Sequence, residues 1–483
     1  MKLTTRLGLT VLAILLVSLP NARSQDKDST GKDKTATIKD VSYYKQVRPL
    51  FQQHCQGCHQ PSRDKGGFVM TTHASLFKQG DSGEFGIVKG QPNKSYLVER
   101  IIPHNGKRAE MPPEGDPLTD YQVKLIQTWI AEGATDDTPE TAKVIVDADH
   151  PPVYNLPPVI TSIDYSPDGK ILAVAGYHEV VLHKADGSGR LARLIGAAEQ
   201  ISSVVFSPNG KLLAVTGGSP GRFGEVQIWD VRKHRLKLAK SITFDTVYGA
   251  SWSKDGSIVA FGCADNSTRA INARTGEQVF FNGGHNDWVL DTVFSVKDDH
   301  LVTVSRDMSM KLSVVKTSRL VDNITSITPG ALKGGLMTVD RHPTKDELVI
   351  GGSDGTPKIY KMFRTKARKI GDDYNLIRKF AAMPGRVYTV RYSHDGNKII
   401  CGSSDTGKGE IRIYDANKGN LLTKLKSITG PIYSAQFSPD GKVIASAGFE
   451  GVVRFHDAKT GTLIRELVPF PLREQQAKAS QQQ

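Results

Sequence analysis

The sequence contains little cysteine: only four of its 483 residues. Cys263 and Cys401 are isolated and far apart, so a disulfide framework of the kind found in small secreted domains is excluded. The other two, Cys55 and Cys58, are three positions apart. A structural disulfide or half of a zinc site is an alternative for this pair, but zinc would need a second Cys/His pair at ligand spacing. The chemistry of the Cys55–Cys58 pair therefore has to be explained first.

Long apolar runs are also scarce. The longest, residues 7–19, has thirteen residues and is short for a membrane span. Lys2 and Arg6 precede this run, and the small-x-small sequence Ala22-Arg23-Ser24 follows it, which is typical of a secretory signal. We predict a signal peptide at 1–25, a flexible polar linker at 26–41 and no membrane span in the mature chain. The protein is then expected to be periplasmic or otherwise exported.

A clustered basic stripe is missing, although the formal net charge is +13. Residues 26–150 hold 16 Lys and Arg against 18 Asp and Glu, whereas residues 151–483 hold 44 against 32. The excess basic residues are scattered along the chain and are not interleaved with aromatic residues, which argues against nucleic acid as a partner. It favours an acidic partner or an anionic surface. The second part of the chain also shows no metal-ligand spacing, nucleophile elbow or phosphate loop.

The most informative motif is Cys55-Gln56-Gly57-Cys58-His59. In a C-x-x-C-H segment each thiol can add to one vinyl group of a porphyrin, and the histidine can then ligate the iron. A thioredoxin-like redox pair would need a β-α-β setting, which the flanking sequence does not provide. Export supports the first interpretation, since covalent haem is attached outside the cytoplasm. The motif predicts one covalent haem c bound to Cys55 and Cys58, with His59 as an iron ligand.

Helical patterns stand on both sides of this motif. Apolar residues at helical spacing lead from Tyr43 towards His59. Near residue 120, Thr119 and Gln122 form a capping box, an apolar stripe follows, and Gly133 ends the pattern. We predict a small all-α c-type cytochrome domain at 42–134, in which haem supplies much of the apolar core that so short a domain lacks.

The sixth iron position has one favoured ligand and three rivals. Met111 precedes Pro112-Pro113, and these prolines stiffen the backbone that would present its thioether to iron. The rivals are His104, which also follows a proline, Met70 and His73. His54 is expected on the helix surface and not among the ligands.

Several short segments in one order resemble the planctomycete-type cytochrome c domain. They are the ranges 47–50, 55–59, 65–68, 90–95, 110–113 and 129–134. The resemblance covers about ninety residues. It implies covalent haem on Cys55 and Cys58, His59 as the proximal ligand, and Met111 of the Met-Pro-Pro motif as the opposite ligand.

After a proline-rich linker at 135–158 the sequence becomes periodic. An apolar strand, a Ser-Pro-Asp-Gly-like turn and a second apolar strand recur from Ser166 to Ser438, at steps that make seven units of four short strands. This period predicts an all-β seven-bladed propeller at 159–469. We expect the last strand, 463–467, to complete the first blade and close the ring. Residues 470–483 are expected to form a disordered tail.

The repeated units resemble WD repeats, with Trp229-Asp230 as the one true WD dipeptide and Gly284-His285 as the clear Gly-His pair. Aspartates recur at the turn between second and third strands, which indicates turn formation. They are Asp265, Asp307, Asp354 and Asp405. Cys263 and Cys401 fall on second strands of different units and are expected to be buried free thiols.

The chain is thus expected to be a multidomain exported cytochrome for single-electron transfer, without substrate turnover of its own. The propeller would be a docking module, with a redox partner protein and a propeller-bound protein as partners. One alternative is a redox enzyme whose propeller holds a second cofactor or substrate, as in other cytochrome–propeller oxidoreductases. Those propellers have eight blades and different repeat signatures. The other alternative is a scaffold that haem only stabilises.

Overall fold

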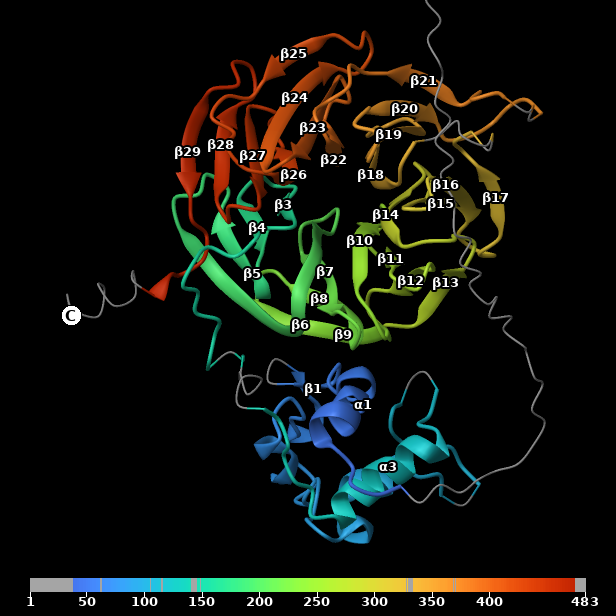
Figure 1. Ribbon diagram of the computed structural model, residues 1–483, viewed down its shortest axis with the longest axis vertical. Coiled ribbons are helices and arrows are strands. Elements are labelled where there is room, and N and C mark those ends of the chain that lie inside the picture. Colours follow the sequence, from blue (N-terminus) through green and yellow to red (C-terminus); the bar gives the residue numbers. More distant parts are fainter. Residues whose placement is uncertain are drawn as a thin grey trace, which may run out of the picture. The chain divides into compact units, whose positions relative to one another are not determined.

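The computed structural model describes residues 38–60, 63–104, 106–113, 116–139, 146–147, 149–326, 328, 333–367, 369 and 371–473. The predicted signal peptide at 1–25, most of the predicted linker at 26–41 and most of the predicted tail lie outside these residues. Within residues 39–483 a small region with few helices is followed by antiparallel sheets (Figure 1).

The helical region is built from short elements. A π-helical turn, η1 (Tyr43–Val47), runs directly into α1 (Arg48–His54), and the haem-type motif begins at the next residue. The remaining elements are β1 (His59–Gln60), β2 (Arg63–Asp64), η2 (Lys65–Gly67), η3 (Ala74–Phe77), η4 (Pro92–Lys94), α2 (Tyr96–Ile101) and α3 (Asp120–Ala131).

The two predicted helices are confirmed, and they pack through aromatic rings. The capping box of Thr119 and Gln122 opens α3, and Gly133 with φ 98° follows its end. Trp129 on α3 is fully buried, with its ring stacked on Tyr43 at a centroid distance of 5.2 Å and edge-on to Phe51 at 6.2 Å. Side chains of this region therefore form a core of their own.

From residue 163 onward the chain forms antiparallel strands. Their bounds are β3 (Ile163–Tyr165), β4 (Ile171–Ala175), β5 (Tyr177–Lys184), β6 (Arg190–Phe206), β7 (Leu212–Ser219), β8 (Phe223–Asp230), β9 (Arg235–Thr243), β10 (Val247–Trp252), β11 (Ile258–Cys263), β12 (Thr268–Asn272), β13 (Gln278–Asn282), β14 (Val289–Phe294), β15 (His300–Ser305), β16 (Met310–Val314), β17 (Leu320–Asn323), β18 (Leu336–Arg341), β19 (Glu347–Gly352), β20 (Lys358–Lys361), β21 (Leu376–Lys379), β22 (Arg386–Tyr392), β23 (Lys398–Asp405), β24 (Lys408–Asp415), β25 (Leu421–Lys424), β26 (Ile432–Phe437), β27 (Val443–Gly448), β28 (Val453–Asp457) and β29 (Leu463–Leu467).

The recurring Ser-x-Asp-Gly turn explains why first and second strands pair at a fixed register. In the first copy, Gly169 (φ 68°) donates its N–H to the Ser166 carbonyl at 2.8 Å. The Ser166 hydroxyl donates to Asp168 at 2.6 Å and accepts the N–H of Ile171 at 2.9 Å, at the start of the second strand. The copies that begin at Ser207, Ser253, Ser393 and Ser438 make the same bonds.

The strands from β10 to β29 form five sheets of four consecutive strands, and β3 to β9 form one sheet of seven. The larger sheet arises because β6, seventeen residues long, pairs with β5 along its first half and with β7 along its second. It serves as the fourth strand of one set and the first strand of the next. With β6 used twice, the strands fall into the seven four-strand sets that the repeat period predicts.

The predicted exchange of the last strand is wrong. β29 pairs with β28 of its own set, with Val453 opposite Leu467, and the first set takes its fourth strand from β6. The first and last sets nevertheless meet. The N–H of Ile160 donates to the Gly448 carbonyl at 3.0 Å, the Gln436 side chain donates to the Ile163 carbonyl at 3.3 Å, and β3 lies beside β26 (Figure 1).

The described ends of the predicted spacer and tail are fixed to the sheets. Tyr154 donates to Glu179 at 2.8 Å, and Arg193 bonds both oxygens of this buried carboxylate as well as the Pro152 carbonyl. Tyr154 also forms a parallel bridge with Leu472, and Phe470 is only 1% exposed. The loose tail therefore cannot begin at 470, because residues 470–473 pack against the segment that precedes the first set.

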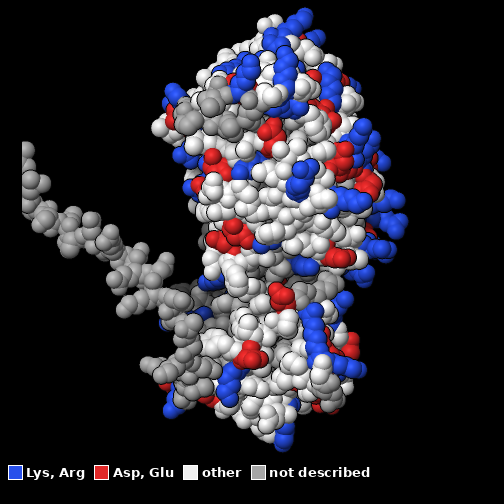
Figure 2. All heavy atoms as spheres, turned by 90° about the vertical axis from the view of Figure 1, so that its right-hand side faces the viewer, with Lys and Arg blue, Asp and Glu red and all other residues white. Residues whose placement is uncertain are grey.

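Other expectations concern the surface and the isolated thiols. Cys263 and Cys401 are buried free cysteines on β11 and β23, second strands of their sets, as predicted. Figure 2 shows a face on which basic and acidic side chains are interspersed. In the described part of the chain, no helix has the length and apolar character needed to cross a membrane.

Candidate functional site

The residues of the C-x-x-C-H motif are brought together by one tight turn at the end of α1. The N–H of Cys55 still donates to Phe51, at 2.9 Å, as in a helix. The N–H groups of Cys58 and His59 then both donate to the Cys55 carbonyl at 3.1 Å. Both cysteines are half-buried free thiols, and burial, with a further contribution from Cys58, raises the pKa of the Cys55 thiol to about 12. A disulfide between them is not formed.

The His59 ring is oriented by the loop that follows the motif. Its Nδ1 lies 3.0 Å from the carbonyl oxygen of Phe68, and the Phe68 ring packs edge-on at a centroid distance of 5.9 Å. A backbone carbonyl at Nδ1 is the usual partner of a metal-ligating histidine, because it fixes the tautomer and the ring orientation. This contact makes Nε2 the nitrogen that would ligate iron.

His54 is not the surface residue that the helical pattern predicts. It is half-buried, and its Nε2 is buried without a hydrogen-bond partner among the described residues. Burial lowers the pKa of its imidazole. A polar atom with no partner, one residue before Cys55, fits a site that a bound group completes.

Met111 is placed by a different element from the motif. Its N–H donates to the Arg100 carbonyl at 2.9 Å, near the end of α2, and the side chain is half-buried. The peptide bond to Pro112 is cis. Met111 is therefore a half-buried thioether in a loop, as the sequence predicts, and not a residue of the apolar core.

The three rivals are each engaged elsewhere. His73 Nε2 lies 2.8 Å from the Ala134 carbonyl, and the ring packs against Tyr43 and Phe77. His104 is exposed, with Nε2 at 2.9 Å from the Glu99 carbonyl. Met70 donates its N–H to the His59 carbonyl at 2.8 Å, and its side chain is fully buried.

Taken together, these residues fit a covalently attached haem. The turn presents two thiols and an oriented imidazole from five consecutive positions, and His54 supplies a buried polar atom beside them. No group of three or more His, Cys, Asp or Glu side chains that could hold a metal ion by itself occurs among the residues the structure describes. A porphyrin would supply the equatorial iron ligands that such a group would otherwise provide.

Sequence reasoning missed that the motif also contacts the sheets. Gly57, between the two cysteines, lies so close to β9 that a Cβ atom there would come within 2.8 Å of the Ala239 carbonyl oxygen. Ser241 of β9 donates from its hydroxyl to the Gln52 carbonyl of α1 at 3.0 Å. The buried side chain of Gln60 lies against the carboxylate of Glu225 on β8. No local pattern marks these contacts, since they join segments far apart in the sequence.

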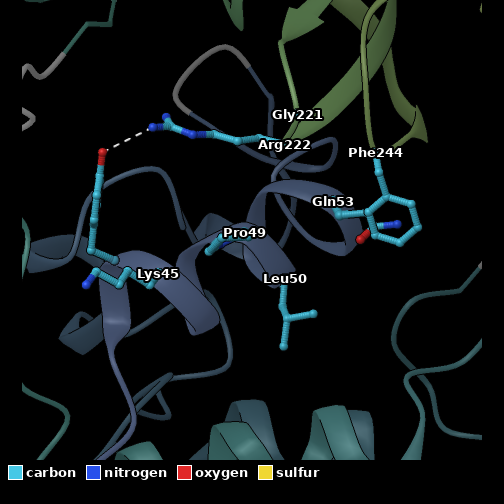
Figure 3. A pocket seen from close by; sticks show the side chains of 8 residues that line it. Lys45, Pro49, Leu50, Gln53, Gly221, Arg222 and Phe244 are labelled. Carbon is cyan, nitrogen blue, oxygen red and sulfur yellow. Dashed lines mark hydrogen bonds between the residues drawn. The ribbon is translucent and has the colours of Figure 1, made fainter. Parts of the chain in front are cut away.

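A cavity of about 380 Å³ borders the same contact region (Figure 3). Arg222 of the β7–β8 turn donates to the Tyr44 hydroxyl at 3.1 Å across it and lies 3.4 Å from Glu199. Leu50 and the exposed Phe244 also line it. Glu199 balances the charge of Arg222, and Lys45 is a second basic residue in the lining.

Three of the four recurring aspartates hold turns, as predicted. Asp265 accepts the N–H of Ser267 at 3.1 Å, and Asp354 accepts that of Thr356 at 3.0 Å. Asp307 accepts the N–H of Ser309 and also binds Nδ1 of His285 at 2.9 Å. His285 Nε2 in turn lies 2.7 Å from the Thr303 hydroxyl, so this buried polar network ties one loop to the second strand of its set.

Comparisons with known proteins agree with this division of the chain. Residues 55–115 match the family described as planctomycete cytochrome C. Residues 189–230 and 419–457 match the WD domain, G-beta repeat. The chain is also 28% identical over 225 residues to Protein SOF1 of Saccharomyces cerevisiae, a match that covers 41% of this chain and 37% of that protein.

Proposed function

We propose that this chain, in which a planctomycete cytochrome C domain precedes WD repeats, is an exported c-type cytochrome that carries one haem for single-electron transfer. The observation that carries the proposal is the turn that groups Cys55, Cys58 and an oriented His59. Haem bound there would supply an iron that cycles between ferric and ferrous states.

The residues of the chain would have separate tasks. Cys55 and Cys58 would hold the porphyrin covalently, and His59, kept in one orientation by the Phe68 carbonyl, would ligate the iron. Met111, half-buried in the loop after α2, is proposed as the second protein ligand. A thioether and an imidazole together would leave no iron position open to a substrate, which favours electron transfer over chemistry on a bound substrate.

For the second part of the chain, we infer that the seven four-strand sets close into a seven-bladed propeller. The hydrogen bonds between the first and last sets support this closure. The propeller would serve as a docking module for a partner protein in the periplasm or another exported compartment. The alternative function, a redox enzyme whose propeller holds a second cofactor, is tested by extracting cofactors from the purified protein. A second chromophore besides haem would support that alternative.

Single and double cysteine variants test haem attachment. Cys55→Ala and Cys58→Ala should each retain at most one thioether bond, and the double variant should lose haem from the denatured chain. The measurement is haem-linked peroxidase staining on a denaturing gel, with mass spectrometry of the haem peptide. Cys263→Ala is the matched control and should stain like the wild type. Full staining of the double variant would overturn the proposal.

The axial ligand is tested by a second substitution. Met111→Ala should abolish the weak sulfur-to-iron band at the red end of the ferric spectrum, while His104→Ala should leave it in place. Retention of the band in Met111→Ala would assign the sixth position to another residue.

A further inference from the structure

The sheet that contains β8 and β9 touches the haem-type motif at Gly57 and its flanking residues at two further points. The Ala239 carbonyl faces Gly57 between the cysteines, Ser241 bonds the Gln52 carbonyl of α1, and Glu225 meets Gln60, the residue directly after His59. The motif and the residues on both sides of it are therefore in contact with β8 and β9.

Glu225 is an unusual residue for such a position. Its side chain is 1% exposed, yet none of the described residues places a cation against it. Gln227 donates to it at 2.7 Å, and the Trp229 indole donates to Gln227 at 2.8 Å. Burial raises the pKa of Glu225 to about 7, against the opposing effects of Gln227, the Ala198 backbone and Gln60. A buried carboxylate without a counter-ion is costly and is rarely kept for stability alone.

Among the side chains that the structure describes, those directly around Glu225 carry no charge. Gly217 of β7 and Ser241 of β9 stand opposite it in the sheet, Ala198 reaches it from β6, and Gln60 reaches it from β1. Lys240, next to Ser241, donates from Nζ to the Gly276 carbonyl. A charge on Glu225 would therefore act on the motif with little local compensation.

We propose that Glu225 is a positioning residue for the haem ligand His59, acting through Gln60, so that the WD-repeat part forms one wall of the haem site and sets its reduction potential. This inference rests on the proposed function. Gln60 is bonded covalently to His59 and its buried side chain lies against the Glu225 carboxylate, so the charge on Glu225 lies one residue away from the ligand. The ferric site carries one more positive charge than the ferrous site. The Glu225 carboxylate therefore favours the ferric form and lowers the potential.

The test is a redox titration of the full haem-loaded chain at pH 5.5 and pH 8.5. Glu225→Gln keeps the shape of the side chain and one acceptor oxygen but removes its charge. We expect its midpoint potential to lie above that of the wild type at pH 8.5, where Glu225 is mainly ionised, and to match it at pH 5.5. Gln60→Ala should also shift the potential, because the link to His59 is lost.

Glu410→Gln is the matched control. Glu410 is a carboxylate of another set that bonds Arg412 and Lys424, so its loss perturbs the sheets without touching the motif. The midpoint potential of Glu410→Gln should equal that of the wild type at both pH values. Equal potentials for wild type, Glu225→Gln and Gln60→Ala, in chains that carry haem and melt normally, would overturn the inference. A chain without covalent haem would instead overturn the proposed function.

Discussion

At the scale of single residues, two carboxylates of the first set, Asp164 and Asp168, differ in the direction in which folding shifts their pKa. Asp164 on β3 is half-buried and accepts the N–H of Phe206 at 2.7 Å, and desolvation raises its pKa to about 7. Asp168, in the exposed turn that follows, has a pKa lowered mainly by the hydrogen bond from Ser166. Burial is thus the main cause of the pKa shift of Asp164, and hydrogen bonding is the main cause of the pKa shift of Asp168.

The pKa of Asp164 gives a prediction for stability. An unfolded aspartate releases its proton near pH 4, whereas folded Asp164 keeps it until about pH 7. The free energy of unfolding should therefore fall as the pH rises through this window. The Asn side chain of Asp164→Asn can still accept the Phe206 N–H. In urea titrations taken from pH 4 to pH 7, the free energy of unfolding of this variant should therefore fall less with pH than that of the wild type.

Asp168→Asn is the comparison for that experiment. Because the pKa of Asp168 is lowered on folding, this residue stabilises the protein above pH 4, and its contribution is lost as the pH falls below that value. Its variant should therefore change the stability profile at the acid end. A profile for Asp164→Asn that is parallel to that of the wild type would contradict the assignment.

At the scale of elements, local chemistry decided what could be predicted from sequence. The capping box at Thr119, the Ser-x-Asp-Gly turns and the buried thiols depend on residues a few positions apart, and the structure confirms them. The length of β6, the true partner of β29 and the contact of Gly57 with Ala239 were missed. They depend on which distant segment lies alongside, and strand periodicity does not encode that choice.

The capping box gives a prediction for α3. Thr119→Ala removes the hydroxyl that accepts the Gln122 N–H and should lower the free energy of unfolding of the helical region by about 1 kcal/mol. Thr128→Ala is the control on the same helix, because that hydroxyl only bonds back to the Lys124 carbonyl and alanine is the better helix former. Thermal melts followed by circular dichroism should show a loss for the first variant and no loss for the second.

At the scale of the whole molecule, the segment after β29 joins the two ends of the sheet-forming region. Phe470 packs edge-on against Tyr154 at a centroid distance of 5.4 Å, and His183 Nε2 lies 3.0 Å from the Pro469 carbonyl. The N–H of Arg473 donates to the Tyr154 carbonyl at 2.9 Å. These contacts connect the first set with the end of the described chain, in place of the strand exchange expected from sequence.

This connection predicts different effects for two phenylalanines. Phe470→Ala should lower the free energy of unfolding by about 3 kcal/mol, since it empties a fully buried site. Phe449 is 58% exposed, and its replacement by alanine should change stability by less than about 0.5 kcal/mol. Urea unfolding of both variants measures the difference, and equal midpoints would show that the connection at residue 470 contributes nothing.

The continuous strand β6 has a consequence for dividing this chain into fragments. In a repeat array of separate units, a gene can be cut between any two units, and each piece keeps its strands. Here a cut between the first and second sets would divide one strand, leaving the first set without its outer edge or the second without its inner strand. A fragment that starts at the first set and keeps every strand whole must therefore extend at least to the end of β9. This fragment also contains Glu225 and Ala239, the residues of β8 and β9 that contact the haem-type motif and its flank.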